Sequence, residues 1–426
     1  MSATRAPLPE PEIEVVLGTD AVPRLVAWSA RRAGALVVMD ANTADAAGSA
    51  VAGALRTAGI DVTELVFEQR SGLRAGLPEV ERVRSSVREG VVPVAVGSGV
   101  ITDIVRYAAH LQDSDFVSVP TAASMDGYAS SVAALQIDDV KVTFPARAPR
   151  AIFADPVVAA AAPAELTRSG IGDLLAKATA RVDWLAAHLL YGEPYSEEIA
   201  GLVLEPLSFA AANVQAVVMG DVAGVRSLLG GLVQSGIAMA IAGSSRPASG
   251  CEHHASHFWD LLAARGMRRH HPHGLQAGYA TRVGMRLQRF AFAGGLPALR
   301  LPEPATDPLG PAAREWLGEP TPEIVAAVQE KQRFVGSLES WPRTEAEWDE
   351  VRVRIAPALE VFDRVDSALD RVGIPFGAGY LDVDERMLRA TFRFAGRLRA
   401  RYTVIDFLEG QGKLGEAIDA VLAGGG

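Results

Sequence analysis

The sequence has very little cysteine and no excess of positive charge. Only one cysteine, Cys251, occurs in 426 residues, which excludes an intrachain disulfide and is typical of a reducing compartment. Acidic residues outnumber basic ones by 51 to 41, for a formal net charge of -10 at pH 7. A general basic surface that would attract nucleic acid or an anionic membrane is therefore not expected. These features favour a small molecule as the partner.

The sequence also lacks an uninterrupted apolar run of membrane-spanning length. The apolar segment from Ile199 to Val218 is broken by Glu205 and Pro206, and a spanning helix needs about 20 consecutive apolar residues. The first residues have neither the basic start nor the apolar core of a secretory signal. We therefore expect no membrane span and a cytoplasmic location.

The first half of the chain alternates short strands with helix-compatible segments. Compact apolar or β-branched runs occur at Leu36–Met39, Val62–Phe67, Val92–Val96 and Phe116–Val119. This rhythm predicts a Rossmann-like, mostly parallel and doubly wound sheet. Beyond it lie long Ala, Leu, Glu and Arg-rich segments at Ser196–Met219, Val222–Ala242, Glu345–Val372 and Glu385–Leu408. We predict an α/β dinucleotide-binding domain at 1–162 and an all-helical domain at 163–426, with the active site in the cleft between them.

A glycine-containing turn follows the third predicted strand. The residues after Val92–Val96 are Gly97, Ser98, Gly99, Val100, Ile101, Thr102 and Asp103, and apolar residues then continue at helical spacing. Backbone N–H groups at such a helix start can hold a pyrophosphate. Thr102 stands where GxGxxG has its third glycine. An ordinary strand-to-helix turn is therefore an equally good interpretation.

A loop rich in hydroxyls and small side chains follows the fourth predicted strand. It runs through Thr121, Ala122, Ala123, Ser124, Asp126 and Ser130. In open α/β sheets, ligands bind at the carboxyl ends of the strands. The alternative is a polar turn capped by Asp126.

An acidic residue, Asp40, closes the first predicted strand. Its carboxylate could accept hydrogen bonds from an adenosine ribose and repel a 2′-phosphate, which would favour NAD over NADP. The same side chain could instead cap a helix that begins near Thr43. Asn42 is an equally good candidate for the cofactor contact.

Histidine is concentrated in one short window. Six of the eight histidines lie there: His253, His254, His257, His270, His271 and His273. On a helix, His253 and His257 share one face because they are four residues apart, whereas His254 points elsewhere. His273 begins the helical run Leu275–Leu287, so its ring can turn toward the same cleft. His270 and His271 follow two arginines and are expected to be solvated.

The histidines call for a further metal ligand, and the best candidate is Asp173. It lies at what looks like the glycine-marked start of an apolar helix, where capping is its only other obvious role. A carboxylate with two imidazoles suits Zn²⁺, Fe²⁺ or Ni²⁺. We predict a divalent metal, with zinc the first expectation, bound by Asp173, His253 and His273.

Several long motifs occur in an order that resembles a known family. They are Gly97–Asp103, Pro120–Ser131, Gly172–Lys177, Ser249–Trp259 and Arg399–Asp406. Together they are similar to the sn-glycerol-1-phosphate dehydrogenases, which belong to the dehydroquinate synthase and iron-containing alcohol dehydrogenase superfamily. The resemblance implies reversible hydride transfer between NAD(P)H and dihydroxyacetone phosphate, a role in phospholipid metabolism, and a homo-oligomer.

The resemblance also assigns roles to residues. It implies NAD(P) contacts from Gly99 to Asp103, from Thr121 to Ser124 and at Ser130, and metal ligation by Asp173, His253 and His273. Asp126 and His257 would face the substrate, with Asp173 beside it as the third catalytic residue. Cys251 departs from the small hydroxyl or glycine of the family pattern, and the lead-in to His273 is also unusual.

Three other functions stay open at this point. A polyol or alcohol dehydrogenase of the same superfamily would keep the metal and nucleotide without a phosphate site. A cyclase of dehydroquinate synthase type would recycle its NAD, and a binding or regulatory protein would have lost turnover. Lys141, Arg147 and Lys177 are available cations for a substrate phosphate, but none lies in a recognisable phosphate motif.

Overall fold

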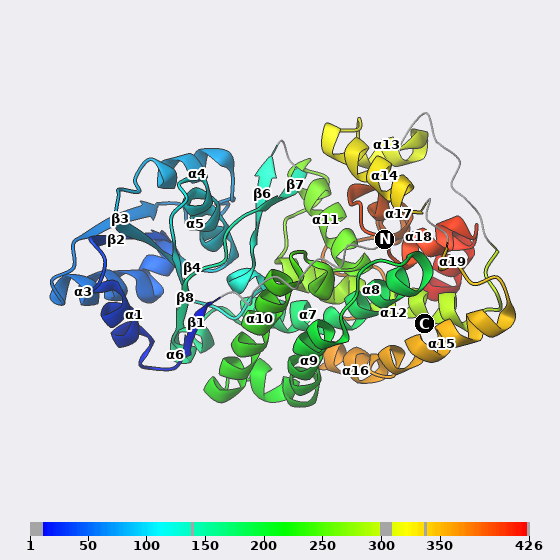
Figure 1. The fold of residues 1–426 in the computed structure, drawn as a ribbon, viewed down its shortest axis with the longest axis horizontal. Helices are drawn as coiled ribbons and strands as arrows, with labels where there is room; N and C mark the ends of the chain where they lie inside the picture. The colour runs from blue at the N-terminus through cyan, green and yellow to red at the C-terminus, as the bar shows by residue number, and fades with distance from the viewer. Residues whose placement is uncertain (1–11, 138–139, 299–308, 336–338, 424–426) are drawn as a thin grey trace. The chain divides into compact units, whose positions relative to one another are not determined.

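The computed structural model describes residues 12–137, 140–298, 309–335 and 339–423, and the chain forms two compact units (Figure 1). Unit 1 comprises Met1–Leu174 and Asn213–Ser245, and unit 2 comprises Leu175–Ala212 and Arg246–Gly426. Each unit is therefore discontinuous in sequence.

A six-stranded parallel sheet forms the centre of unit 1, in the order β1-β8-β5-β4-β2-β3. Its strands are β1 (Glu14–Leu17), β2 (Gly34–Asp40), β3 (Val62–Phe67), β4 (Val91–Gly97), β5 (Val117–Pro120) and β8 (Ala151–Ala154). The predicted strands correspond to β2, β3, β4 and β5, so the predicted parallel sheet is confirmed. The strands that the sequence did not reveal, β1 and β8, are only four residues long.

Both faces of the sheet are covered by helices, as Figure 1 shows. Successive side chains of a strand point to opposite faces. In β2, Val37 and Met39 join the core made with α1 (Ala21–Ser29) and α3 (Ser49–Thr57). Leu36 and Val38 join the core made with α4 (Leu77–Arg84) and α5 (Gly99–Leu111). A strand buried on both faces reads as a continuous apolar run, which is why these strands were recognisable.

The other elements of unit 1 extend from this sheet. They are α2 (Ala41–Thr43), η1 (Ala44–Gly48), η2 (Gly127–Ala129), the antiparallel hairpin of β6 (Val132–Ile137) and β7 (Val140–Pro145), α6 (Pro156–Ala160), α7 (Ala164–Leu175) and α10 (Val222–Ala242). The hairpin contributes Ala133 and Leu135 to the core under α4 and α5.

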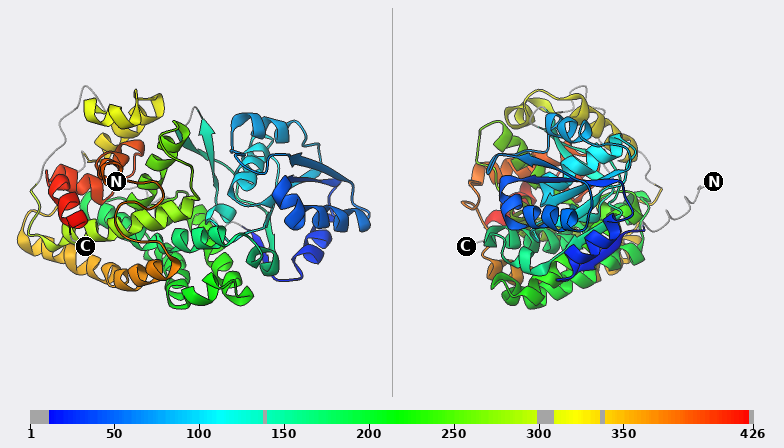
Figure 2. Two further views of the ribbon diagram at one scale, coloured as in Figure 1. Left: turned by 180° about the vertical axis from the view of Figure 1, so that it is seen from behind. Right: turned by 90° about the vertical axis from the view of Figure 1, so that its left-hand side faces the viewer.

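Unit 2 contains helices and no strand among its described residues (Figure 2). They are α8 (Lys177–Tyr191), α9 (Glu197–Val218, which continues into unit 1), η3 (Arg246–Ala248), α11 (Cys251–Ala264), α12 (His273–Ala293), α13 (Gly310–Leu317), α14 (Pro322–Val335), α15 (Glu345–Leu359), α16 (Phe362–Val372), α17 (Glu385–Phe394), η4 (Ala395–Leu398), α18 (Val404–Gly410) and α19 (Leu414–Ala423). The predicted helical second half is confirmed.

Two predicted helices are shorter than expected. The segment 345–372 ends one helix at Leu359 and begins another at Phe362. The segment 385–408 is interrupted at residues 399–403, where Arg401 Nη1 donates to the Ser249 carbonyl at 2.7 Å and Thr403 starts α18 with a capping box. The interruption at 399–403 coincides with a long-range contact and a cap, which the periodicity of apolar residues does not reveal.

The helices α9 and α10 are long and apolar enough to cross a membrane, and 33% and 56% of their most apolar stretches are buried. Core helices of soluble proteins meet the same criterion, so this observation is weak evidence for a membrane. The prediction that no segment spans a membrane stays a prediction.

Candidate active site

The glycine turn has the predicted strand–turn–helix geometry. β4 ends at Gly97, Ser98 has extended backbone, and α5 begins at Gly99. A Cβ on Gly97 would lie 2.8 Å from the Ile101 Cβ, so glycine is needed there for the helix to approach the strand. At Gly99 a Cβ would meet only ordinary contacts, the nearest at 3.5 Å. Packing within the described chain therefore does not explain the second glycine.

The hydroxyl-rich loop lies beside this turn because β4 and β5 are paired in parallel, with Gly97 opposite Pro120. The Thr121 N–H donates to the Gly97 carbonyl at 3.2 Å, and the hydroxyls of Ser98 and Ser124 are 2.5 Å apart. The two segments predicted to bind the cofactor thus share the carboxyl edge of the sheet.

Several of the predicted cofactor residues already have partners in the protein. Asp103 forms a 2.6 Å ion pair with Arg106, whose guanidinium also donates to the carbonyls of Tyr128 and Val132 at 3.0 and 3.1 Å. The Ser130 hydroxyl accepts the Val132 N–H at 3.1 Å. The buried Arg106, which the sequence did not single out, thus fixes the segment that follows the loop. Cofactor contacts by Asp103 and Ser130 stay a prediction.

Asp40 caps a helix in this structure. Its Oδ1 accepts the backbone N–H groups of Asn42 and Thr43, each at 2.8 Å, and the Thr43 hydroxyl accepts the Asp40 N–H at 3.0 Å. Of the two interpretations of Asp40, the structure therefore shows the helix cap. The Asn42 side chain is bonded to the Arg70 carbonyl at 2.8 Å. Ribose binding by either residue stays a prediction.

Asp173 is buried in the last turn of α7, with no measurable exposure. The prediction that it starts a helix was wrong. Gly170 does not interrupt α7. It is required because a Cβ there would lie 1.9 Å from the Ala123 carbonyl oxygen, so the glycine lets α7 pack directly on the hydroxyl-rich loop. An acid at the negative end of a helix dipole is unfavourable, which points to a role other than capping.

A second carboxylate, Asp126, contacts Asp173. The Asp126 N–H donates to the Asp173 Oδ2 at 3.0 Å, and the Asp126 Oδ2 accepts the buried Ser235 hydroxyl at 3.1 Å. The hydroxyl of Ser169 donates to the Ser124 carbonyl at 3.0 Å. These bonds fix both predicted catalytic acids of unit 1 beside the hydroxyl-rich loop.

Three of the histidines gather in unit 2, where α11 packs against α12. The ring centroid of His273 is 5.0 Å from that of His253 and 5.7 Å from that of His257. The Nδ1 of His273 is 2.9 Å from the Ser256 hydroxyl. The predicted convergence of these rings is therefore present in unit 2.

The neighbouring histidines lie elsewhere. His254 is 1% exposed, and neither of its ring nitrogens has a hydrogen-bond partner among the described residues. Burial lowers its pKa well below the ordinary value, and nearby cations including Lys331 act in the same direction. The side chain of His270 is 72% exposed, as predicted, whereas that of His271 is only 15% exposed, and its Nε2 lies 3.0 Å from the Asp382 Oδ2.

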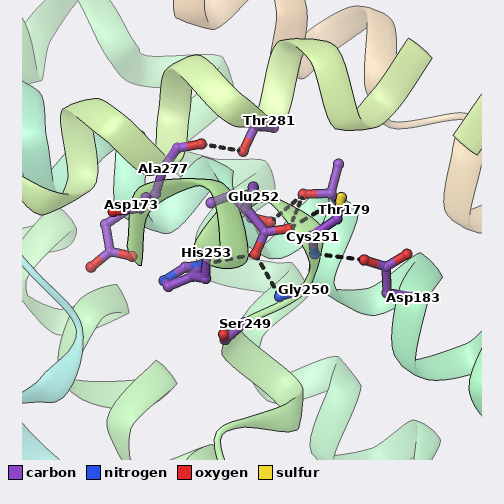
Figure 3. Close-up of polar contacts among 12 residues, drawn as sticks. Asp173, Thr179, Asp183, Ser249, Gly250, Cys251, Glu252, His253, Ala277 and Thr281 are labelled. Carbon is purple, nitrogen blue, oxygen red and sulfur yellow. Dashed lines mark hydrogen bonds and ion pairs between the residues drawn. The ribbon is translucent and has the colours of Figure 1, made fainter. Parts of the chain in front are cut away.

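A buried acid that the sequence did not single out, Glu252, holds His253 (Figure 3). Its Oε1 lies 2.7 Å from the His253 Nδ1 and also accepts the Gly250 N–H at 2.6 Å, while its Oε2 accepts the Thr179 hydroxyl at 2.7 Å. Burial would raise the pKa of Glu252, but these bonds and the His253 charge together hold it below the ordinary value. Glu252 is therefore a carboxylate that orients the His253 ring.

Two of the predicted metal ligands come together in unit 2, where the ring centroids of His253 and His273 are 5.0 Å apart. The third, Asp173, belongs to unit 1, and its ligation of the same metal stays a prediction. The Nδ1 of each histidine is engaged, by Glu252 or Ser256, which leaves Nε2 as the nitrogen to assign to a metal. One carboxylate and two such imidazoles are the donors that catalytic divalent metals use, so the residues fit such an ion.

A second cluster of possible ligands, Asp183, Cys251 and Glu252, has a different character. The Oδ2 of Asp183 accepts the Cys251 N–H at 2.7 Å, and its Oδ1 accepts from Gln288 Nε2 and the Val404 N–H, each at 2.9 Å. Burial and the nearby Glu252 raise the pKa of Asp183 to about 7. The carboxylates are filled by protein donors, so this cluster is a buried hydrogen-bond network that supports the start of α11.

The candidate phosphate cations are less informative. Lys177 is buried at the start of α8, and Arg147 forms an ion pair with Asp113. Lys141 lies in β7, where its charge acts on Asp103. The structure does not bring these three cations into one anion site within either unit, and the phosphate ligand stays unassigned.

Comparisons with known proteins define the class. Residues 17–163 match the iron-containing alcohol dehydrogenase family. The fold resembles glycerol dehydrogenase from Schizosaccharomyces pombe (TM-score 0.59, 19% identity, 97% of this chain and 91% of that one). It also resembles an iron-containing alcohol dehydrogenase from Thermococcus thioreducens (TM-score 0.59, 15% identity, 97% and 99%). The chain therefore has the fold of this class of oxidoreductases.

Sequence relatives define the family within the class. The chain is 31% identical to glycerol-1-phosphate dehydrogenase [NAD(P)+] of Geobacillus stearothermophilus over 93% of its own length and 92% of the relative's. It is 37% identical to the protein of the same name from Halalkalibacterium halodurans, over 58% of this chain and 62% of that protein. The chain belongs to the glycerol-1-phosphate dehydrogenase family and is an NAD(P)-dependent oxidoreductase.

Proposed function

We propose that this protein interconverts dihydroxyacetone phosphate and sn-glycerol 1-phosphate, with NAD(P)H as reductant and one divalent metal bound by Asp173, His253 and His273. The observation that carries the proposal is the convergence of His253 and His273 in unit 2, with ring centroids 5.0 Å apart and each Nδ1 engaged by a neighbouring oxygen. The names of the sequence relatives give glycerol 1-phosphate as the substrate and NAD(P)+ as the cofactor, and oxidation of the secondary alcohol of glycerol 1-phosphate yields dihydroxyacetone phosphate. We propose zinc as the metal, with nickel or iron as alternatives, and a homo-oligomer in the cytoplasm.

The metal, when bound, would polarise the substrate carbonyl and stabilise the developing alkoxide. The protein prepares its ligands. Glu252 and Ser256 engage the Nδ1 atoms of His253 and His273, which leaves the Nε2 of each ring for the metal. Asp173 is held by the Asp126 N–H, which keeps its carboxylate in a fixed orientation.

The remaining residues bind and orient the reactants. We assign the backbone N–H groups of the first turn of α5, after Gly97 and Gly99, to the cofactor pyrophosphate. Asp126, fixed by Ser235, would accept a substrate hydroxyl. His257 shares a face of α11 with His253 and would hold the proton that the alkoxide takes up.

Metal analysis combined with enzyme assays tests the proposal. The wild type and the variants Asp173→Asn, His253→Ala and His273→Ala are stripped of metal, reloaded and assayed for NADH oxidation with dihydroxyacetone phosphate. The matched control is His270→Ala, because His270 belongs to the same histidine window and is exposed. We expect the three ligand variants to lose bound metal and turnover, and the control to retain both.

The same assay separates the alternatives. Turnover with dihydroxyacetone equal to that with its phosphate would indicate a polyol dehydrogenase. A cyclase would consume a sugar phosphate with no net change in nicotinamide absorbance. Full turnover by a metal-free His253→Ala variant would refute the proposed site.

A further inference from the structure

The sheet order brings three loops together at the place where a dinucleotide would extend from the glycine turn. β2 lies between β4 and β3, and all three strands run parallel. Their carboxyl ends therefore carry, side by side, the turn at Gly97, the acid Asp40 and the segment that contains Arg70. With the pyrophosphate at the start of α5, the adenosine ribose falls at the end of the neighbouring strand, β2.

Asp40 is a weak barrier to a phosphate group at this position. Its Oδ1 accepts two backbone N–H groups at the start of the helical segment that follows β2, so its charge is partly balanced by the positive end of that segment. An acid committed in this way repels a 2′-phosphate less than a carboxylate that faces the ribose alone.

Arg70, in the segment that follows β3, contacts Asn42. Its carbonyl accepts the Asn42 side-chain amide at 2.8 Å, and its Nη1 donates to the Asn42 Oδ1 at 3.3 Å. These two bonds join the segment after β3 to the segment after β2. Arg70 is thereby bonded to Asn42, which follows Asp40 by two positions, although Arg70 itself is 28 residues from Asn42 in sequence.

The guanidinium of Arg70 can be recruited by a ligand at small cost. Its ion pair with Asp45 at 2.8 Å joins side chains that are 63% and 68% exposed, and exposed pairs of this kind contribute little to stability. A dianionic phosphate is a stronger, bidentate partner for arginine than an exposed carboxylate. A cavity of about 460 Å³ is lined by Gln69, which precedes Arg70, and by Gly72 and Arg74, which follow it. The segment that contains Arg70 therefore has open space beside it.

We propose that Arg70 binds the 2′-phosphate when NADP(H) occupies the cofactor site. The proposal rests on the proposed function, since it takes the cofactor to lie across the carboxyl edge of the sheet. The preference between NAD(H) and NADP(H) would then depend on Arg70, which follows β3, as well as on Asp40 at the end of β2.

Cofactor binding measured without substrate tests the proposal. Dissociation constants for NADH and NADPH are obtained from nicotinamide fluorescence for the wild type, Arg70→Gln and Asp45→Asn. The matched control is Arg88→Gln, because Arg88 pairs with Asp61 at 3.4 Å with exposures of 61% and 68% but precedes β4, at the opposite edge of the sheet.

We expect Arg70→Gln to weaken NADPH binding about tenfold or more while NADH binding changes less than about twofold, and Asp45→Asn to tighten NADPH binding. Arg88→Gln should change neither. Equal changes for both cofactors in Arg70→Gln, no change in either, or no binding of NADPH by the wild type would overturn the proposal. Because no triose phosphate is present, failure of the proposed substrate would leave this result standing.

Discussion

Replacing Glu252 with glutamine tests whether a buried carboxylate prepares His253 for a metal. The change removes a charge and leaves the shape intact. The amide oxygen can accept from the Gly250 N–H and the His253 Nδ1, as the Glu252 Oε1 does at 2.6 and 2.7 Å. In the variant, the amide nitrogen can donate to the Thr179 hydroxyl, which is then released to donate to the Ala176 carbonyl 2.9 Å away. All buried partners stay satisfied, so the variant should fold.

The expected effect is a lower affinity for the metal. A charged acceptor makes the hydrogen bond to His253 about twice as strong as a neutral one and increases the basicity of the Nε2 lone pair. Loss of such a partner typically costs about 10–100-fold in metal affinity, which is about 1.4–2.7 kcal/mol. The wild-type carboxylate is fully buried, so water does not replace the lost charge.

The assay is a titration of the metal-free proteins with Zn²⁺ against a chromophoric chelator, alongside urea unfolding without metal. Thr179→Val is the control, because it removes the hydroxyl bonded to the Glu252 Oε2 and keeps the bond to His253. We expect a loss of affinity of at least about tenfold in Glu252→Gln and a much smaller one in the control. A correctly folded Glu252→Gln protein with wild-type affinity would refute the reasoning.

Three further predictions follow from burial and packing. Gly170→Ala should destabilise the protein by at least about 1–3 kcal/mol, since its Cβ would lie 1.9 Å from the Ala123 carbonyl oxygen. Gly201→Ala in α9 is the control: its Cβ would have nothing within 4 Å, so the change should be neutral or stabilising by about 0.5–1 kcal/mol. Urea unfolding measures the free energy of unfolding of both variants. Cys251 is fully buried and burial raises its pKa, so a thiol reagent should label it only after unfolding, and rapid labelling of the native protein would contradict this. His257→Ala should keep the metal but lower turnover, and the pH profile of the residual turnover should change; an unchanged profile would exclude the proposed proton role.

Local signals in the sequence were sufficient for four of the six strands of the central sheet and for the histidines of the proposed site. Buried parallel strands are continuous apolar runs, so β2 and β4 were visible without any knowledge of their neighbours. The strand order was not visible, because it depends on pairing between distant segments. The histidine pair on α11 followed from helical spacing alone.

The supporting residues could not be found in this way. Glu252 meets Thr179 across 73 positions of sequence, and Ser235 meets Asp126 across 109. Neither partner forms a motif with the other. The error at Asp173 has the same origin: the glycines before it were taken to mark the start of a helix, whereas Gly170 leaves room for the carbonyl of Ala123, 47 residues earlier in the sequence.

Asp40 shows why an acid at the end of a strand is an incomplete guide to cofactor preference. The capping and ribose-binding interpretations concern one carboxylate, and the two backbone bonds to its Oδ1 satisfy the first without removing the second oxygen. The sequence did not show which strand end lies beside Asp40. β2 and β3 pair in parallel with Asp40 opposite Phe67, so the next few residues after Phe67, including Arg70, lie at the same edge. In the proposed cofactor site, the charge near the ribose would consequently be the sum over two strand ends, with the acid of one offset by the cation of the other.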